Sequence, residues 1–417
     1  MTTVDVRSAS QRRARPGWRF PLVVFLVVGC ALALVIQVSH DHMTPDTNND
    51  GTAASDMSGP SAHAYIGGWM QYDTGWYVTI AEQGYDDTQV ASFKAGDQSA
   101  VAYFPAYPLA VRQVARATGH DYVLAAELAT ILSGLAVFLL FWSWCEPRMN
   151  ARARRTSLLL LALYPYAWYL YGTGYGDAFF VASSIAAFLM LERDRPVLAG
   201  VAGAVASAAR VTGVGTIAGL VVLSLERQGA LTRTPPSTWY AFWAGWKFDR
   251  SKMRPRDSGV LLSFAGIGAY CVFLWHLVGD AFAFVTVQAA EGWNQGSGPK
   301  TWIKYRFFGD LIRDPSYGGR LLIEALLCVV FLIAIPFVFK RFGMGYTAFV
   351  VVVLGIPLIG TSSMQGFGRY LISAFPVFAL GGVVLSERPR ERSAVLVSSG
   401  LLLFVLASFF GRGFYLS

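Results

Sequence analysis

The stretch MQYDTGWYVTIAEQGY, residues 70–85, sets the carboxylate of Asp73 among aromatic and small residues. Trp69, Asp73 and Trp76 follow one another at spacings of four and three, so a helix through this region would turn the acid toward its aromatic face. A carboxylate in such surroundings can act as a general base. The other interpretation is that Asp73 caps a short helix, TGWYVTIAEQ, that ends at Gly84. The sequence leaves both interpretations open.

Further charged residues occur where the sequence predicts helix ends. Asp177 follows YPYAWYLYGTGYG, Arg210 lies in SAARVTG, and Arg369 lies beside a glycine in MQGFGRYLISAFP. We expect these three side chains to meet at one face of the membrane. An arginine at such a position can bind a phosphate through two N–H groups, or a structural carboxylate or lipid headgroup. For Arg369, binding of a phosphate and a structural role both stay open. For Arg210, the structural role is favoured. Glu127 and Glu324, within apolar stretches, are functional candidates unless they lie near helix ends.

The segment AYFPAYPLAVR, residues 102–112, places aromatic rings beside two prolines. Pro105 and Pro108 interrupt any helix, although Pro108 can lie in the first turn of the next one. Aromatic rings in this setting can form a substrate cradle at the membrane surface, or an ordinary aromatic belt that anchors a surface helix.

Motifs for nucleotide or metal chemistry are missing from the sequence. It contains no nucleotide-binding glycine loop, no HExxH, no CxxC, and no DxD motif in a loop where one would hold a metal and a nucleotide sugar. HDH at residues 40–42 could ligate a metal, but next to a polar, flexible stretch it more often belongs to a solvated linker. We therefore expect no metal site.

These residues belong to a chain of 417 residues that is 54% hydrophobic and 14% charged, with a mean hydropathy of +0.44. Apolar windows of about 17–25 residues, enough to cross a bilayer as a helix, recur along it. We predict an all-α polytopic membrane protein with about 11 transmembrane helices. The predicted spans are residues 20–38, 122–142, 157–171, 178–191, 197–209, 214–225, 259–278, 320–339, 344–361, 370–386 and 394–411.

The basic residues predict the orientation of the chain. Most of the 34 Lys and Arg residues fall on the side of the N-terminus, which is cytoplasmic by the positive-inside rule. We predict a basic cytoplasmic tail over 1–19 and one membrane domain over 20–417 with its C-terminus outside. The first extracytoplasmic loop, 39–121, is large and carries short interfacial helices. A second covers 279–319, whereas 226–258 is cytoplasmic and resembles an interfacial segment. The net charge of +8 then reflects membrane orientation, not nucleic-acid binding.

Taken in order, several segments resemble bacterial PIG-V-like mannosyltransferases, relatives of the second mannosyltransferase of GPI-anchor synthesis. These segments are YDTGWYVTIAEQGY, AYFPAYPL, YPYAWYLYGTGYGDAFF, SAARVTG, GDAFAFVTVQAAEGW and FGRYLISAFP, and they extend over residues 65–386. Two positions depart from the family pattern. Tyr72 stands where the family usually has Trp, and YGD at 175–177 stands where it often has YSE, which leaves the role of Asp177 open.

The resemblance implies a GT-C fold, that of a multi-helix membrane glycosyltransferase whose donor is a sugar on a polyprenyl phosphate and whose active site is extracytoplasmic. It implies that Asp73 is the catalytic base and that mannose is transferred, with inversion, to a glycolipid or glycan acceptor. No cofactor or metal is expected, because a phosphate leaves as an anion once cations stabilise it. The candidates for binding the donor phosphate and the substrates are Arg369, Tyr370, Arg210, Trp76, Tyr77, Tyr103, Tyr107 and Asp177.

Two alternatives remain at this point. Within the same class, the donor sugar could be another polyprenyl-phosphate sugar. From a different class, a secondary transporter or lipid flippase also has many helices and sparse intramembrane charges. A transporter more naturally shows paired halves with acids at the midplane, and the sequence has no convincing inverted repeat.

Overall fold

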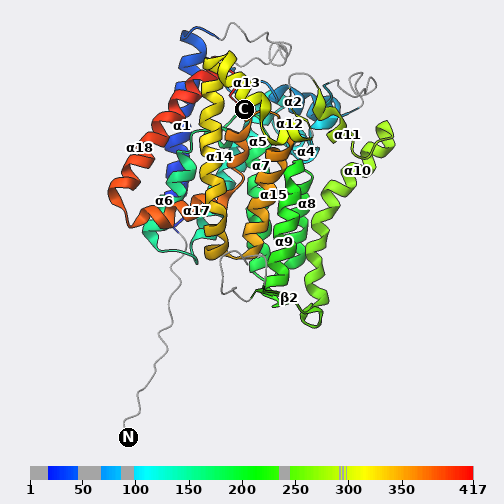
Figure 1. Cartoon of the computed structure of the whole chain (residues 1–417). Helices are drawn as coiled ribbons and strands as arrows, with labels where there is room; N and C mark the ends of the chain where they lie inside the picture. Colours follow the sequence, from blue (N-terminus) through cyan, green and yellow to red (C-terminus); the bar gives the residue numbers. More distant parts are fainter. Residues whose placement is uncertain are drawn as a thin grey trace.

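The computed structural model describes residues 17–45, 67–85, 98–233, 245–290, 293, 295–296 and 298–416, and these are mostly helical. Long helices run side by side, and short helices gather at one end of the bundle (Figure 1). Among the described residues, five helical segments are long and apolar enough to cross a membrane. They are α1 (Arg19–His42), α5 (Tyr122–Cys145), the 3-10 helix η7 (Pro255–Phe264) continued by α10 (Ala265–Val278), α14 (Pro315–Phe342) and α18 (Pro389–Gly411). The prediction of a helical membrane protein is confirmed.

Shorter helices complete the bundle and pack closely. They are α6 (Ala151–Ala162), α7 (Asp177–Glu192), α8 (Pro196–Ser207), α9 (Val214–Arg227), α15 (Met344–Gly360) and α17 (Phe375–Ser386). At the contact of α6 with α17, a β-carbon on Gly382 would come within 1.9 Å of Ser157 Oγ. Small residues allow this approach, which matters because lipid is as apolar as the side chains and gives helices little hydrophobic reason to associate.

Short helices at one end of the bundle connect the long ones. They are α2 (Thr74–Gln83), η2 (Ala100–Ala102), α4 (Ala106–Ala115), η3 (Ala167–Leu170), η4 (Val211–Gly213), α11 (Ala283–Thr286), η8 (Val287–Ala289), α12 (Pro299–Trp302), α13 (Tyr305–Arg313) and α16 (Phe367–Leu371). The short helices predicted within 39–121 are present as α2, η2 and α4. Residues 40–42 form the last turn of α1 and not a linker, while 46–66 and 86–97 lie outside the described residues.

The loop of residues 226–258 contains a small antiparallel sheet. Strand β1 (Leu231–Arg233) pairs with β2 (Trp246–Phe248), and the 3-10 turn η6 (Arg250–Lys252) follows. This hairpin is the described strand structure in an otherwise helical protein, and Thr, Trp and Phe in it favour extended backbone. Residues 234–244 lie outside the described residues.

Two of the predicted spans are interrupted near prolines. The helix predicted over 157–171 ends at Ala162, because Pro165 lacks an N–H group and disfavours helical backbone in the residue before it. The helix predicted over 370–386 is divided into α16 and α17, and Pro376 lies in the first turn of α17. Both breaks occur at the end of the bundle that carries the short helices, where they free residues for other contacts.

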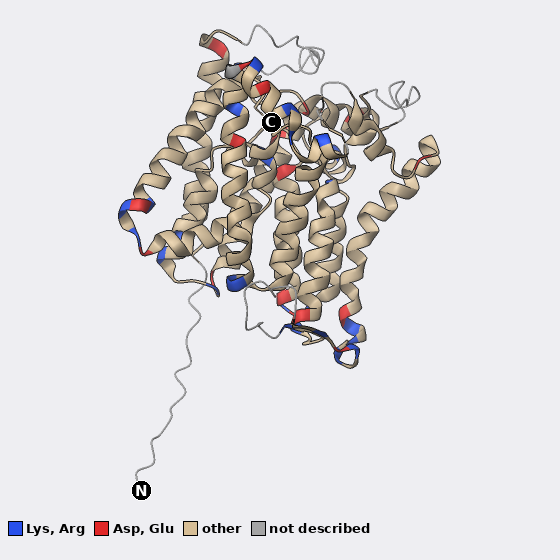
Figure 2. Ribbon diagram, in the orientation of Figure 1, with Lys and Arg blue, Asp and Glu red and all other residues tan. Residues whose placement is uncertain are grey.

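Helices α1 and α18 run in the same direction and pack side by side. Ser39 Oγ hydrogen-bonds Ser408 Oγ at 2.7 Å, and His40 Nδ1 bonds the carbonyl of Gly411 at 3.2 Å. The C-terminal residues therefore lie at the end of the bundle where α2 and α4 gather (Figure 1). Charged residues are concentrated toward the two ends of the bundle, and few lie along the middle of the helices (Figure 2).

The close approach of α6 and α17 gives a test of the packing. We expect Gly382→Ala to destabilise the protein by about 2 kcal/mol, because the new methyl group would overlap Ser157. Gly268→Ala in α10 is the matched control, since its β-carbon would meet nothing within 4 Å. Thermal unfolding of the two purified variants in detergent measures the difference. Equal melting temperatures would contradict the α6–α17 packing.

Candidate active site

Asp73 stands directly before α2, but its side chain does not cap that helix. The helix begins at Thr74 and ends before Gly84, whose φ of 87° suits a helix terminus, as the sequence predicts. The reading of Asp73 as a side-chain cap is wrong. With φ −58° and ψ −17° its backbone is already helical, whereas a capping residue is extended. Its backbone N–H donates instead to Tyr175 Oη at 3.1 Å.

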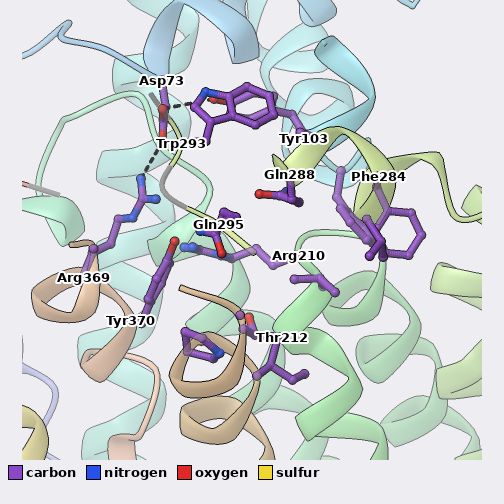
Figure 3. A pocket seen from close by; sticks show the side chains of 18 of the residues that line it. Asp73, Tyr103, Arg210, Thr212, Phe284, Gln288, Trp293, Gln295, Arg369 and Tyr370 are labelled. Atoms are coloured by element: carbon purple, nitrogen blue, oxygen red, sulfur yellow. Dashed lines mark hydrogen bonds and ion pairs between the residues drawn. The ribbon is translucent and has the colours of Figure 1, made fainter. Parts of the chain in front are cut away.

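Both carboxylate oxygens of Asp73 are held from opposite sides. Tyr103 Oη donates to Oδ1 at 3.1 Å, and Arg369 Nη1 donates to Oδ2 at 2.8 Å (Figure 3). The Tyr103 ring is itself fixed, because Trp76 stacks on it with ring centroids 5.6 Å apart. The Asp73 side chain remains 18% exposed, so it is oriented and still accessible.

Arg369 belongs to the short helix α16, which its neighbours hold tightly. Gly366, before the helix, has a φ of 85°, a conformation that favours glycine. A β-carbon on Gly368 would lie 2.5 Å from the ring of Tyr166. The N–H of Gly368 donates to the buried Glu324 Oε2 at 3.0 Å. Glu324, a functional candidate in the sequence, therefore anchors the segment that carries Arg369.

Asp177, in the first turn of α7, is the counter-ion of two arginines. Its carboxylate is only 1% exposed, Oδ1 is ion-paired with Arg210 Nη1, and Oδ2 lies 3.9 Å from Arg369 Nε. Neither that Oδ2 nor that Nε has a hydrogen-bond partner among the described residues. Arg210 and Arg369 each lie 5.3 Å from the ring centroid of Tyr370. The structure thus brings together Asp177, Arg210 and Arg369, as the sequence predicts. The partner of Arg210 is the carboxylate of Asp177, in agreement with the structural role favoured for this arginine.

The surroundings fix the protonation of two groups. Burial and the Asp73 carboxylate raise the pKa of Tyr103 well above its usual range, so this hydroxyl stays a donor at physiological pH. Burial alone would lower the pKa of Arg369, but the carboxylates of Asp177 and Asp73 outweigh burial and hold that pKa well above its usual range. Arg369 therefore remains a cation.

A cavity of about 440 Å³ opens beside this charge cluster, a size typical of small-molecule sites. The predicted site residues that line it are Asp73, Tyr77, Tyr103, Arg210, Arg369 and Tyr370. Asp73, Arg210 and Arg369 are the charged residues among all the described residues that line the cavity.

Three predicted site residues do not line the cavity themselves. Trp76 stacks on Tyr103, and Asp177 lies buried against the two arginines. Tyr107 is fully buried, and its hydroxyl bonds Thr130 Oγ1 on α5 at 2.7 Å. Its aromatic neighbourhood in the sequence gives no sign of this contact with a distant helix.

Other residues line the cavity that sequence patterns do not single out. They are chiefly Gln288, Trp293, Gln295, Gln365 and Tyr415. Gln288 and Trp293 lie within GDAFAFVTVQAAEGW, one of the segments that carries the family resemblance, which is the only signal that could have found them. A neutral amide carries no signal of its own, because glutamine is common on any protein surface.

The described residues include no group of three or more His, Cys, Asp or Glu side chains that could hold a metal ion. In the HDH stretch, Asp41 accepts hydrogen bonds from Gln37, and His40 bonds the carbonyl of Gly411. His40 therefore joins α1 to α18, whereas Asp41 bonds to the preceding turn of α1 itself.

Comparison with known proteins finds similarity in solved structures only. No protein-family profile matches the chain, and no curated protein does. The chain is similar to ArnT from Cupriavidus metallidurans bound to undecaprenyl phosphate, with 16% identity and a TM-score of 0.48, over 92% of this chain and 63% of that one. It is also similar to the Archaeoglobus fulgidus oligosaccharyltransferase in the apo form, with 12% identity and a TM-score of 0.47, over 94% and 56% of the two chains. This chain thus spans less than two thirds of the length of either protein.

The buried Asp177 gives a test of the charge cluster. We expect Asp177→Asn to destabilise the protein by about 3 kcal/mol, because it leaves the buried Arg369 and the largely buried Arg210 short of a counter-ion. Asp194→Asn is the matched control: its ion pair with Arg227 is exposed, and its loss should cost under about 1 kcal/mol. Thermal unfolding in detergent separates the two variants. A destabilisation by Asp177→Asn no larger than that of the control would contradict the counter-ion role.

Proposed function

We propose that this protein is an inverting membrane glycosyltransferase that moves a sugar, mannose by its sequence resemblance, from a polyprenyl phosphate to a glycolipid or glycan acceptor. The observation that supports it most is the geometry of Asp73. An oriented carboxylate faces a cavity, and the other charged residues in the described lining are the arginines Arg210 and Arg369. One base and a pair of cations are the groups that displacement of a phosphate from a sugar requires.

In the proposed reaction Asp73 accepts the proton of an acceptor hydroxyl. That oxygen forms a bond to the anomeric carbon of the donor sugar while the bond from this carbon to the phosphate oxygen breaks. The electron pair of the broken bond stays with the phosphate, which leaves as polyprenyl phosphate with one more negative charge. Because the attack occurs opposite the leaving group, the anomeric configuration inverts.

The arginines replace the acid that a glycosidase needs. A glycosidase must protonate a poor alkoxide leaving group with a second carboxylic acid, whereas a phosphate leaves as an anion. Arg369 is the first candidate to stabilise it, since this residue lines the cavity and remains a cation. When Arg369 turns toward the phosphate, Asp73 loses its strongest partner and becomes a better base.

The position of the cavity suits an amphiphilic donor. Apolar residues of α11 and α15, among them Val285, Ile356 and Pro357, line it together with the charged residues. A polyprenyl chain can then remain in the membrane lipid while its phosphate and sugar reach the cavity. We propose that the protein resides in the cell membrane with its N-terminus in the cytoplasm and the active site on the outer face, in keeping with the distribution of basic residues.

Replacement of the base tests the mechanism. We expect Asp73→Asn to lower transfer from a labelled polyprenyl-phosphate mannose by at least about 100-fold, because Asn cannot accept the proton. The assay uses membranes in which the variant is inserted at the level of the wild-type protein. Asp194→Asn, on an exposed ion pair away from the cavity, serves as the control and should transfer normally. Undiminished transfer by Asp73→Asn would remove Asp73 as the base.

Removal of divalent ions tests the proposed independence from metals. We expect the same transfer rate with and without EDTA, because the arginines supply the positive charge at the phosphate. The measurement is the rate of label transfer by the purified protein before chelation, after it, and after readdition of Mg²⁺ or Mn²⁺. Loss of transfer in EDTA that a divalent ion restores would contradict the proposal.

A further inference from the structure

On one side of the cavity, the described lining residues carry no charge. They include Gln288, Trp293 and Gln295, which we call the neutral wall. In the view of Figure 3, Trp293 is drawn beside Asp73, and Gln288 and Gln295 are drawn on the side toward Arg210. A donor with its phosphate at the arginines and its anomeric carbon within reach of Asp73 would place its sugar ring in this part of the cavity.

The backbone on both sides of the neutral wall is anchored to the rest of the fold. On one side, Phe284 packs edge-to-face on Phe104 with ring centroids 5.1 Å apart, and Val287 is fully buried. On the other side, the N–H of Gly296 donates to the carbonyl of Gly360 at 2.8 Å, and Gln295 forms a β-bridge with Thr361. The described backbone next to Gln288 and at Gln295 is therefore tied to neighbouring elements, which favours a recognition surface.

The two side-chain amides of the neutral wall form no hydrogen bond within the described part of the protein. The side chains of Gln288 and Gln295 are half-buried, and neither makes a hydrogen bond to another described residue. Each offers one acceptor and two N–H donors. Sugar hydroxyls both donate and accept, so they match amides that are held beside a cavity with their hydrogen bonds unmade.

The third residue of the wall offers a flat apolar surface. The indole of Trp293 meets Tyr103 nearly edge to face, with ring centroids 6.0 Å apart and an interplanar angle of 85°. It meets Trp76 in a similar way, at 6.4 Å and 78°. These contacts fix the indole next to the residue that orients Asp73. A rigid aromatic surface of this kind can support the apolar face of a sugar ring above the base.

We propose that the neutral wall reads the hydroxyl groups of an uncharged hexose, so that Gln288, Gln295 and Trp293 determine which donor sugar is transferred. This inference rests on the proposed glycosyltransferase function. Of the charged residues in the described lining, Asp73 serves as the proposed base, and Arg210 and Arg369 serve as the cations for the phosphate. An amino sugar would bring an ammonium group toward two guanidinium groups with no additional carboxylate in the described lining to receive it, and its desolvation would be costly.

The experiment compares three donors on the same polyprenyl phosphate, carrying mannose, its epimer glucose, or an amino sugar. We measure kcat/KM for each with the wild-type protein and with Gln288→Ala and Gln295→Ala. We expect the wild-type protein to prefer one neutral epimer and to reject the amino sugar. Each variant should reduce the preference between epimers by about tenfold, because one hydrogen bond to a hydroxyl is lost. Gln113→Ala, on the exposed face of α4, is the matched control and should keep the preference.

A second measurement separates sugar recognition from binding of the phosphate. Inhibition by free polyprenyl phosphate, which carries no sugar, should be unchanged in both glutamine variants. Gln288→Glu and Gln295→Glu keep the side-chain shape and should also lose the epimer preference. Because these variants fill the same space, misfolding would not explain that loss.

Several results would overturn the inference. An unchanged epimer preference in the glutamine variants, a wild-type protein that treats both epimers alike, or preferred transfer of the amino sugar would each do so while leaving the transferase function intact. Parallel loss of phosphate inhibition would assign the glutamines to structure. Absence of transfer from every donor by the wild-type protein would overturn the proposed function itself, and the inference with it.

Discussion

The guanidinium of Arg369 lies between two carboxylates inside the protein, and the rest of the site is built around it. It donates to Asp73 at 2.8 Å and faces Asp177 at 3.9 Å, while Asp177 also neutralises Arg210. Charges that are buried or mostly buried are tolerated only when they are paired. The four side chains come from α7, α16, the start of α2 and the turn after α8, so their pairing requires the whole bundle to be assembled. Short helices, glycine contacts and the anchor at Glu324 all hold that geometry.

The sequence predicts the elements of this arrangement better than their contacts. Apolar windows long enough to cross a bilayer locate the long helices, because lipid requires every backbone group to be paired within the helix. The sequence also identifies Asp73, Asp177, Arg210 and Arg369, because charged residues are rare in such a chain. It does not reveal that Asp73 fails to cap its helix, since the partner that draws the carboxylate away is 296 residues distant along the chain. Contacts of this kind depend on tertiary structure alone.

The errors and omissions have the same physical origin. Tyr107 resembles the other aromatic candidates in type and position, and only its contact with Thr130 on α5 distinguishes it as structural. The spans near Pro165 and Pro376 are overestimated because an apolar run continues where the backbone cannot remain helical. Gln288 and Gln295 escape notice because an amide is informative only once it is seen unpaired beside a cavity.

In the proposed reaction, the charge cluster and the neutral wall of the cavity have different roles. The charge cluster pairs two carboxylates with two guanidinium groups, so their formal charges balance before reaction. As Asp73 takes up a proton, the cluster gains a positive charge while the leaving phosphate gains a negative one, and Arg369 can follow that change by moving from one partner to the other. The neutral wall takes no part in this exchange of charge and is free to discriminate among sugars.

The stereochemistry of transfer tests the central claim most directly, because a single base and a phosphate leaving group permit one displacement only. The measurement is the NMR assignment of the anomeric configuration in the product that the purified protein makes from a donor of known configuration. The account predicts inversion. Retention would require a covalent intermediate or a second catalytic carboxylate, and would contradict the assignment of Asp73 as a base.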